Sequence, residues 1–89
     1  MPSLLDKALK DLRPGTSQFK VLVYLAFKGP ASPNQISEET GISPGTVRPA
    51  LRALLVKKYL SQRRDGSYQS KIAFTDFVSD IYLNYIRKS

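Results

Sequence analysis

The 89-residue sequence contains neither cysteine nor histidine. Without cysteine there can be no disulfide bond, no thiolate metal site and no thiol redox switch. Without histidine, the commonest metal ligand and the usual general base near neutral pH are both missing. Of the seven acidic residues only Glu38 and Glu39 are adjacent, and adjacent residues on a helix do not face each other. We therefore expect a protein that is not an enzyme and that holds no metal or cofactor.

Long apolar runs are also absent. No stretch approaches the roughly 18 apolar residues that a membrane-spanning helix needs, and no charged segment followed by an apolar one opens the chain. We expect neither membrane insertion nor secretion, and hence a cytoplasmic location. The length suits a single domain, residues 1–89, whose modest core would gain stability from a partner chain.

Basic residues outnumber acidic ones, and the excess is unevenly distributed. The chain has 14 lysines and arginines against 7 aspartates and glutamates, a net charge of +7. Six of these net charges lie within residues 43–71, which contain seven basic residues and one acid, Asp65. A solvated charged face is the plain interpretation. The concentration in one segment instead favours a surface that binds a polyanion.

Two short helices joined by a tight turn are predicted at residues 33–40 and 44–57. Ser32 and Ser43 can each cap a helix, and each precedes a proline at the first helical position, where a missing N–H costs nothing. Gly41 can adopt the left-handed conformation that ends the first helix. This pattern is typical of a helix-turn-helix, which presents its second helix to the major groove of DNA. One side of the pair carries the apolar residues Ile36, Ile42, Val47, Leu51, Leu54 and Leu55.

The flanking segments complete the expected order α-α-α-α-β-β-α, a mainly helical fold with a small β-hairpin. Helical spacing of apolar residues predicts helices at 3–12, 17–28 and 76–87, and period-two spacing predicts strands at 60–64 and 68–74. Asp65-Gly66 between the strands is a hairpin signal, because both residues tolerate positive φ. The hairpin at 60–74 would form a wing. A third, very short strand is expected near Ala31.

This order resembles the winged helix-turn-helix family of transcription regulators, in particular the MarR-like, TrmB-like and PadR-like groups of archaea and bacteria. The resemblance covers about residues 19–76. It is carried by ISEETGISPGTVRPALRALLVKKYL, by the turn Arg64-Asp65-Gly66-Ser67 and by the junction IAFTD. It implies binding to double-stranded DNA and pairing of the terminal helices across a two-fold axis.

Three residues depart from the family pattern. Pro49 lies within the second helix of the motif, the recognition helix, so we expect a kink or a tight first turn there. Tyr59 stands where relatives often carry the glycine that closes this helix. Ser67 stands where many MarR-like wings carry an arginine, and Arg63 and Arg64 can take over its role.

Arg48 and Arg52 are one turn apart, on the side of the recognition helix opposite its apolar stripe. We expect one of them to contact a base, since arginine reads guanine through two acceptors, with a phosphate contact as the alternative. At the helix N-terminus, free N–H groups favour a phosphate, although a pure capping role is favoured for Ser43. The other residues predicted to contact DNA are Asn34, Gln35, Ser43, Gly45, Thr46, Pro49, Arg63, Arg64, Tyr68 and Lys71, with packing favoured for Tyr68.

The terminal helices are more apolar than a small monomer core requires, which favours an interface between two copies. Packing within an aromatic-rich monomer core is the alternative. The predicted interface residues are Leu4, Leu5, Leu9, Leu12, Phe77, Val78, Ile81, Tyr82, Tyr85 and Ile86. A two-fold dimer would place two recognition helices about one DNA turn apart, on a pseudo-palindromic site.

The sequence thus predicts a homodimeric transcription regulator that binds double-stranded DNA, most simply a repressor. One alternative is a chromatin or replication-associated protein with little sequence preference. Another is a protein–protein adaptor, which would carry an uncharged or acidic recognition helix. A third alternative is a reader of Z-DNA or RNA. The Z-DNA readers carry a tyrosine within the recognition helix and prolines in the wing, and this sequence has neither at those places. No feature identifies an effector ligand.

Overall fold

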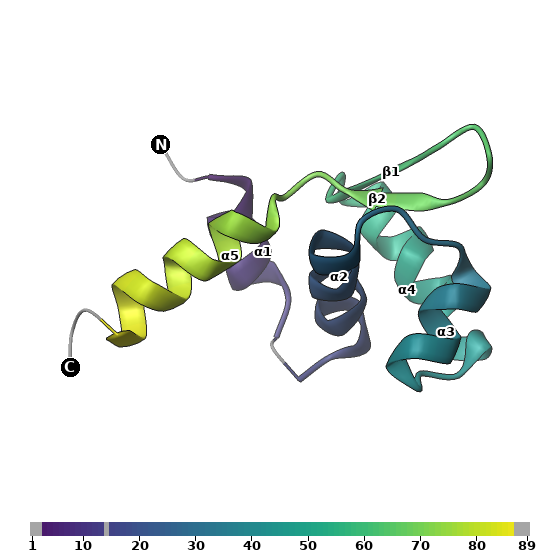
Figure 1. Ribbon diagram of the computed structural model, residues 1–89, viewed down its shortest axis with the longest axis horizontal. Helices are drawn as coiled ribbons and strands as arrows, with labels where there is room; N and C mark the ends of the chain where they lie inside the picture. Colours follow the sequence, from purple (N-terminus) through teal and green to yellow (C-terminus); the bar gives the residue numbers. More distant parts are fainter. Residues whose placement is uncertain (1–2, 14, 87–89) are drawn as a thin grey trace.

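The computed structural model describes residues 3–13 and 15–86, apart from the side chain of Tyr85. It is mostly helical, with a small antiparallel hairpin, as expected for a winged helix-turn-helix (Figure 1). The elements in chain order are α1 (Leu4–Asp11), α2 (Ser17–Lys28), α3 (Pro33–Thr40), α4 (Pro44–Val56), β1 (Leu60–Gln62), β2 (Tyr68–Ser70), α5 (Phe74–Ile81) and the π-helical η1 (Tyr82–Ile86). No helix in these residues is long and apolar enough to cross a membrane.

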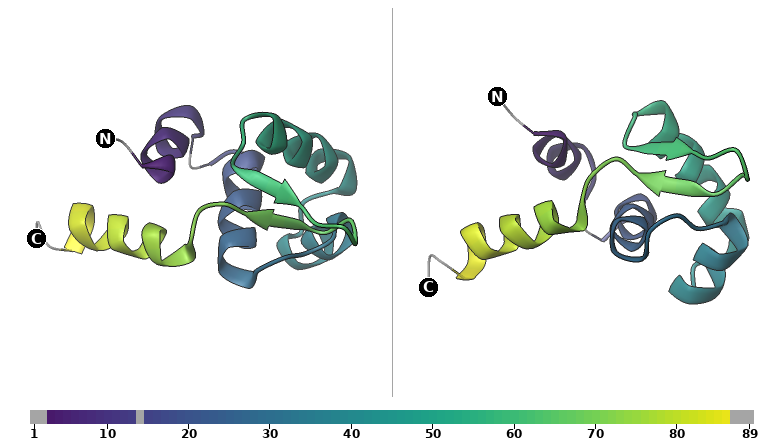
Figure 2. Two further views of the ribbon diagram at one scale, coloured as in Figure 1. Left: turned by 90° about the horizontal axis from the view of Figure 1, so that it is seen from above. Right: turned by 45° about the horizontal axis from the view of Figure 1, so that its top comes forward.

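Helix α2 lies in the middle of the molecule. Figure 1 and Figure 2 show α1 and α5 on one side of α2, and α3, α4 and the hairpin on the other. One cluster of buried apolar side chains, contributed by every helix from α1 to α5, holds these elements together. The fully buried Leu22 and Leu25 of α2 meet Leu51 and Leu54 of α4 in this cluster. Complete burial of one such side chain contributes about 1.5–3 kcal/mol.

Three helices begin with a side-chain cap. The hydroxyl of Ser3 accepts a hydrogen bond from the Asp6 N–H, and the Asp6 carboxylate accepts one from the Ser3 N–H, both at 3.1 Å. Ser32 caps α3 as expected, by accepting from the Gln35 N–H at 3.2 Å. Thr16 caps α2 in the same way. These bonds satisfy N–H groups that have no partner inside the helix, and only the Ser3–Asp6 pair is reciprocal.

The cap predicted at Ser43 is not formed by its side chain. The Ser43 hydroxyl lies 3.1 Å from the hydroxyl of Thr46, and no backbone N–H bonds to it. The Ser43 carbonyl instead accepts from the N–H groups of Thr46 and Val47, both at 2.9 Å. The Thr46 bond spans only three residues, so the first turn is tight, one of the two outcomes expected from Pro49. Helix α4 continues through Pro49 to Val56.

Lys58, not Tyr59, has the conformation that closes α4. Lys58 has φ of +69°, the one positive φ outside glycine among the described residues. The Tyr59 N–H bonds to the Leu54 carbonyl and the Lys58 N–H bonds to the Leu55 carbonyl, both at 3.0 Å. This pair of bonds is a Schellman motif, in which the left-handed residue comes directly after the cap. The left-handed position at the end of α4 is therefore Lys58, one residue before Tyr59.

The wing is shorter than predicted, because its strands end at Gln62 and Ser70. Their register pairs Leu60 with Ser70 and Gln62 with Tyr68. Beyond Ser70 one further bond, from the Lys71 N–H to the Tyr59 carbonyl at 2.9 Å, continues the pairing. The Ile72 N–H faces away from β1 and bonds to the Ser70 hydroxyl at 3.0 Å. Helix α5 then begins at Phe74, two residues before the predicted start. Its predicted end, Arg87, lies outside the described residues.

The turn of the wing also differs from the prediction. The Arg63 N–H bonds to the Ser67 carbonyl at 2.8 Å, which encloses a three-residue loop. Gly66 alone takes a positive φ, +89°, so Asp65 does not need the left-handed conformation. This arrangement is typical of a hairpin closed by a turn and a glycine bulge. The third strand expected near Ala31 is present as a single bridge to Tyr68.

Candidate nucleic-acid interface

The turn between α3 and α4 is held by side-chain hydrogen bonds. The Ser37 hydroxyl donates to the Ile42 carbonyl at 2.6 Å, and the Ile42 N–H donates to the Thr40 hydroxyl at 3.2 Å. Gly41 has φ of +77°, which reverses the chain at little cost for glycine. Ile36, fully buried, anchors α3 in the core. The angle between the two helices is thus determined by both local and core contacts.

Helix α4 has one buried face and one exposed face. Val47, Ala50, Leu51 and Leu54 are buried, as predicted. Arg48 and Arg52 lie on the exposed side. Among the described residues neither guanidinium has an acidic partner, because the two ion pairs there join Lys28 to Glu39 and Lys57 to Asp11. Two arginines are therefore available to an external anion.

The remaining predicted DNA-contact residues are all at the surface. Tyr68 is half-buried against the core, in agreement with the packing role expected for it. The side-chain amide of Gln35 already has a partner within the chain, because it donates a hydrogen bond to the Glu39 carboxylate at 3.1 Å. That bond, with Lys28 nearby, keeps the pKa of Glu39 below its usual value. The exposed ones are Asn34, Gln35, Ser43, Gly45, Thr46, Arg48, Pro49, Arg52, Arg63, Arg64 and Lys71.

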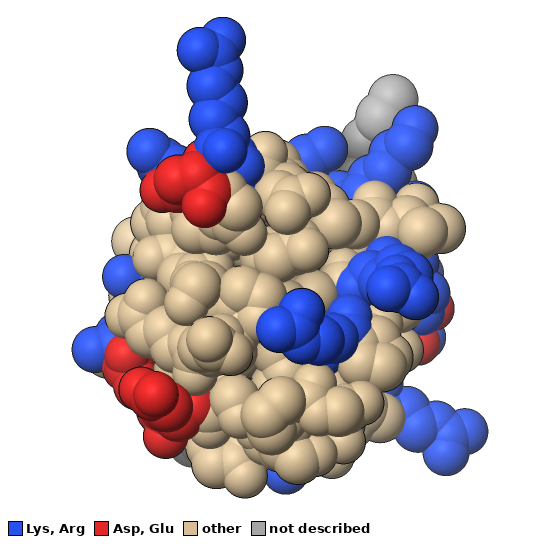
Figure 3. Space-filling model, turned by 90° about the vertical axis from the view of Figure 1, so that its right-hand side faces the viewer, with Lys and Arg blue, Asp and Glu red and all other residues tan. Residues whose placement is uncertain are grey.

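Basic side chains gather on the face formed by α3, α4 and the wing. In Figure 3, which looks onto this face, blue side chains stand at the top, over the right half and along the left edge. The larger red groups lie at the upper and lower left, with a smaller red area at the right edge. The wing carries Arg63, Arg64 and Lys71, all exposed. The carboxylate of Asp65 turns back onto Ser67, accepting from its hydroxyl at 2.6 Å and its N–H at 2.9 Å. These bonds lower the pKa of Asp65.

A crevice of about 150 Å³ lies between the recognition helix and the wing. It joins elements far apart in the sequence: the start of α3, the exposed side of α4 and strand β2. The side chains that line it are Pro33, Arg48, Leu51, Arg52, Leu55 and Tyr68. The sequence predicted each arginine as a contact, but the spacing along the helix did not indicate that Tyr68 closes the same crevice.

A second hollow, of about 380 Å³, separates the N-terminal ends of α2 and α4. Gly45, Thr46 and Pro49 of α4 line it, as predicted contact residues, and so do Thr16, Ser17 and Gln18 of α2. The sequence analysis did not include the α2 residues. The only available signal was Thr16 before an amphipathic helix, which indicates a cap and not a site. No three acidic side chains in residues 3–13 and 15–86 come together as metal ligands.

The predicted dimer residues differ in how far the single chain buries them. Leu5, Leu12 and Phe77 are buried in the core of the single chain, which corrects their assignment to the interface. Leu4 and Leu9 pack partly against that core. The side chain of Tyr85 lies outside the described residues. Four residues on α5 and η1 have 48–57% of their surface exposed: Val78, Ile81, Tyr82 and Ile86.

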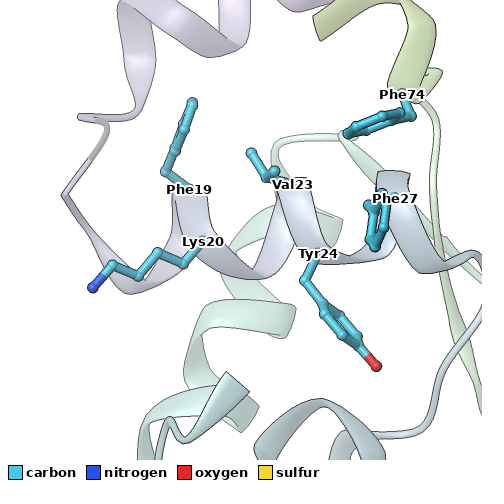
Figure 4. Close-up of a pocket in the computed structure, with 6 residues that line it drawn as sticks. All are labelled: Phe19, Lys20, Val23, Tyr24, Phe27 and Phe74. Atoms are coloured by element: carbon cyan, nitrogen blue, oxygen red, sulfur yellow. The ribbon is translucent and has the colours of Figure 1, made fainter. Parts of the chain in front are cut away.

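The sequence analysis missed a further apolar surface on α2. Phe27 has 63% of its surface exposed, and its ring meets that of Phe74 edge to face, with centroids 5.1 Å apart. Figure 4 shows these rings on one side of a hollow that also contains Phe19 and Val23. Another hollow, of about 280 Å³, shares Phe19, Val23 and Phe74 with it and extends along α5 to Ile81. Phe27 was overlooked because α2 already has a complete inward stripe.

These features define a winged helix-turn-helix protein with an unpaired basic face. The sequence model of the IclR helix-turn-helix domain matches residues 19–64, more than half of the chain. The chain belongs to this family, and it is a DNA-binding transcription regulator. The match spans α2 to the tip of the wing and leaves out α1 and α5.

The comparisons confirm the prediction of a helix-turn-helix regulator at that level. The MarR-like, TrmB-like or PadR-like subgroup stays a prediction. No curated protein and no solved structure matches the chain significantly.

Proposed function

We propose that this regulator acts as a homodimeric repressor that reads a pseudo-palindromic site in double-stranded DNA. One observation carries the proposal: Arg48 and Arg52 are exposed and unpaired by acids within the described chain, on the face of α4 opposite its buried stripe. A recognition helix with two free arginines suits the major groove, where arginine pairs with guanine. The site of action would be the nucleoid, in the cytoplasm.

The wing supplies the sequence-independent part of the contact. Arg63, Arg64 and Lys71 are exposed on the wing and would contact the phosphates or minor groove next to the occupied major groove. Such contacts position a protein on the duplex without reading its sequence. They also predict affinity that falls steeply with salt, because each neutralised phosphate releases counterions.

The exposed apolar side chains of α5 and η1 support a homodimer. Val78, Ile81, Tyr82 and Ile86 are about half exposed in the single chain, and the hollow beside them is apolar. Pairing of two copies across a two-fold axis would remove this surface from water. Half-sites would then be about 10 base pairs apart. A dimer that occupies a promoter in this way would exclude other proteins from it.

Selection of bound sequences from random duplex DNA tests the proposal, with the winning duplex measured at two salt concentrations. An enriched inverted repeat with half-sites about 10 base pairs apart is the expected result. Salt-sensitive binding without enrichment would favour the chromatin or replication-associated role. Absence of binding at low salt would reject a DNA-binding role and favour the protein–protein adaptor.

A further inference from the structure

We infer that the crevice between α4 and the wing is a seat for one DNA phosphodiester, held by Arg52 and the hydroxyl of Tyr68, while Arg48 remains free to read a base. The inference rests on the proposed function and assigns separate roles to two arginines that the sequence could not distinguish. It also gives Tyr68 a direct contact with DNA.

The composition of the crevice suits a phosphodiester. Arg48, Arg52 and Tyr68 share its lining with the apolar residues Pro33, Leu51 and Leu55. Within the described chain, the guanidinium groups of Arg48 and Arg52 and the hydroxyl of Tyr68 make no hydrogen bond or ion pair. Donors without partners next to an apolar floor suit a phosphodiester, whose oxygens take the donors while the adjoining sugar carbons contact the floor.

The shape of the crevice also suits a phosphate. The crevice is concave and bounded by three elements, α3, α4 and β2. Phosphates project from the surface of a duplex, whereas base edges stay within stacked pairs at the floor of the groove. A phosphate can therefore enter a small concave site between a helix and a wing, and a base edge cannot.

The two arginines differ in their position along α4. A recognition helix presents mainly its N-terminal residues to base edges. Arg48 is the fifth residue of α4, and Arg52 lies one turn further toward the C-terminal end. Arg52 is thus further from the bases, on a helix whose other exposed N-terminal residues are small.

Tyr68 is held firmly enough to act as a fixed donor. Its backbone lies opposite Gln62 of β1 in the hairpin register, and its N–H and carbonyl both bond to Ala31. The bridge consists of two hydrogen bonds between the backbones of Tyr68 and Ala31, at 2.8 and 3.1 Å. Its ring packs against the core. A donor fixed in this way loses little conformational freedom when it binds a phosphate.

The experiment compares the full chain with Arg52→Ala, Tyr68→Phe and Arg48→Ala on two duplexes, the selected site and a scrambled sequence, over a range of salt. Arg52→Ala is expected to weaken binding about tenfold on both duplexes and to reduce the slope of log K against log salt by about one. Tyr68→Phe is expected to weaken both by the same, smaller factor, with the slope unchanged. Arg48→Ala, the matched control from the same crevice, is expected to lose affinity mainly on the selected site.

Single neutral methylphosphonate linkages then locate the phosphate. One linkage in each half-site should weaken binding by wild type and by Arg48→Ala, and should weaken binding by Arg52→Ala much less, because only the Tyr68 contact to that phosphate remains. A loss by Arg52→Ala confined to the selected site, or equal sensitivity of Arg52→Ala to every linkage, would overturn the inference and leave the proposed function intact. Failure of the wild type to bind any duplex would reject both. Binding without sequence preference would reject only the operator role, since the linkage scan would still decide the assignment of Arg52.

Discussion

The hydroxyl of Tyr59 donates a hydrogen bond to the carboxylate of Asp11 at 3.1 Å, across 48 positions of sequence. The same carboxylate pairs with the ammonium group of Lys57 at 3.4 Å, and the ammonium group of Lys7 lies 5.9 Å from the centre of the Tyr59 ring. Tyr59 is fully buried at the junction between α4 and β1. The end of α1 is thereby bound to the point where the recognition helix gives way to the wing.

Tyr59→Phe should destabilise the folded chain by about 1 kcal/mol, because the Asp11 carboxylate loses one donor while the ring stays in place. The loss should be read from the midpoint of urea unfolding at neutral pH. Asp11→Asn is the matched control, since its side-chain oxygen can still accept from Tyr59 but no longer pairs with Lys57. An unchanged midpoint for Tyr59→Phe would show that water replaces the hydroxyl without loss.

Stability should fall at alkaline pH. Burial, with the negative charge of Asp11 close by, raises the pKa of Tyr59 above its ordinary value of 10.0. The neutral phenol is therefore favoured by folding; its contribution is complete below pH 10 and is lost as pH rises through the raised pKa. Unfolding free energies between pH 8 and about pH 12 should decline more steeply for the wild type than for Tyr59→Phe, which lacks this group. Parallel curves would refute the assignment to Tyr59.

Lys58→Gly should stabilise the chain by about 0.5–1 kcal/mol. Lys58 has φ of +69° at the end of α4, a conformation that costs a residue with a Cβ but not glycine. Thermal unfolding of the purified variant provides the measurement. Lys58→Ala separates the backbone effect from loss of charge, since alanine keeps the Cβ and should give no gain. If both variants raise the melting temperature equally, charge and not backbone conformation explains the change.

Ile81→Glu should convert the proposed dimer to a monomer. Ile81 is half exposed on α5, so a charge there costs the single chain little but cannot be buried against a second copy. Sedimentation of the two proteins at equal concentration decides the matter. Ser79→Glu places the same charge on the opposite side of α5 and should leave the oligomeric state unchanged. A dimer that persists in Ile81→Glu would remove this face from the interface.

Much of the fold could be predicted because its signals are local. The predicted bounds of α2 and α3 agree with the structure, since each begins at a capping residue and ends at a glycine. The outcome at Ser43 could not be predicted in the same way, because a serine before proline can bond either to the backbone or to the Thr46 hydroxyl. The strand ends were also misplaced. Pairing of β2 with β1 ends at the bond from the Lys71 N–H to the Tyr59 carbonyl, and no sequence pattern marks that end.

Part of the candidate site could be predicted from helical geometry. The position of Arg48 and Arg52 opposite a buried stripe follows from the spacing of Val47, Leu51 and Leu54. The meeting of these arginines with Tyr68 does not follow, because it depends on the angle at which the wing returns past the helix. In the terminal helices, apolar spacing marked Phe77 and Ile81 alike. Only packing against α2 separated the buried Phe77 from the exposed Ile81.

The sequence by itself determined the order of the elements, the exclusion of thiol and imidazole chemistry, and the concentration of positive charge between residues 43 and 71. These depend on residue identity and on contacts within a few positions of the chain. Tertiary structure alone decided which apolar residues form the core, how Asp11 reaches Tyr59, and that two arginines and a tyrosine share one crevice. Each of these is a contact between segments far apart in the chain, where side-chain volume and the direction of neighbouring elements select one partner among many.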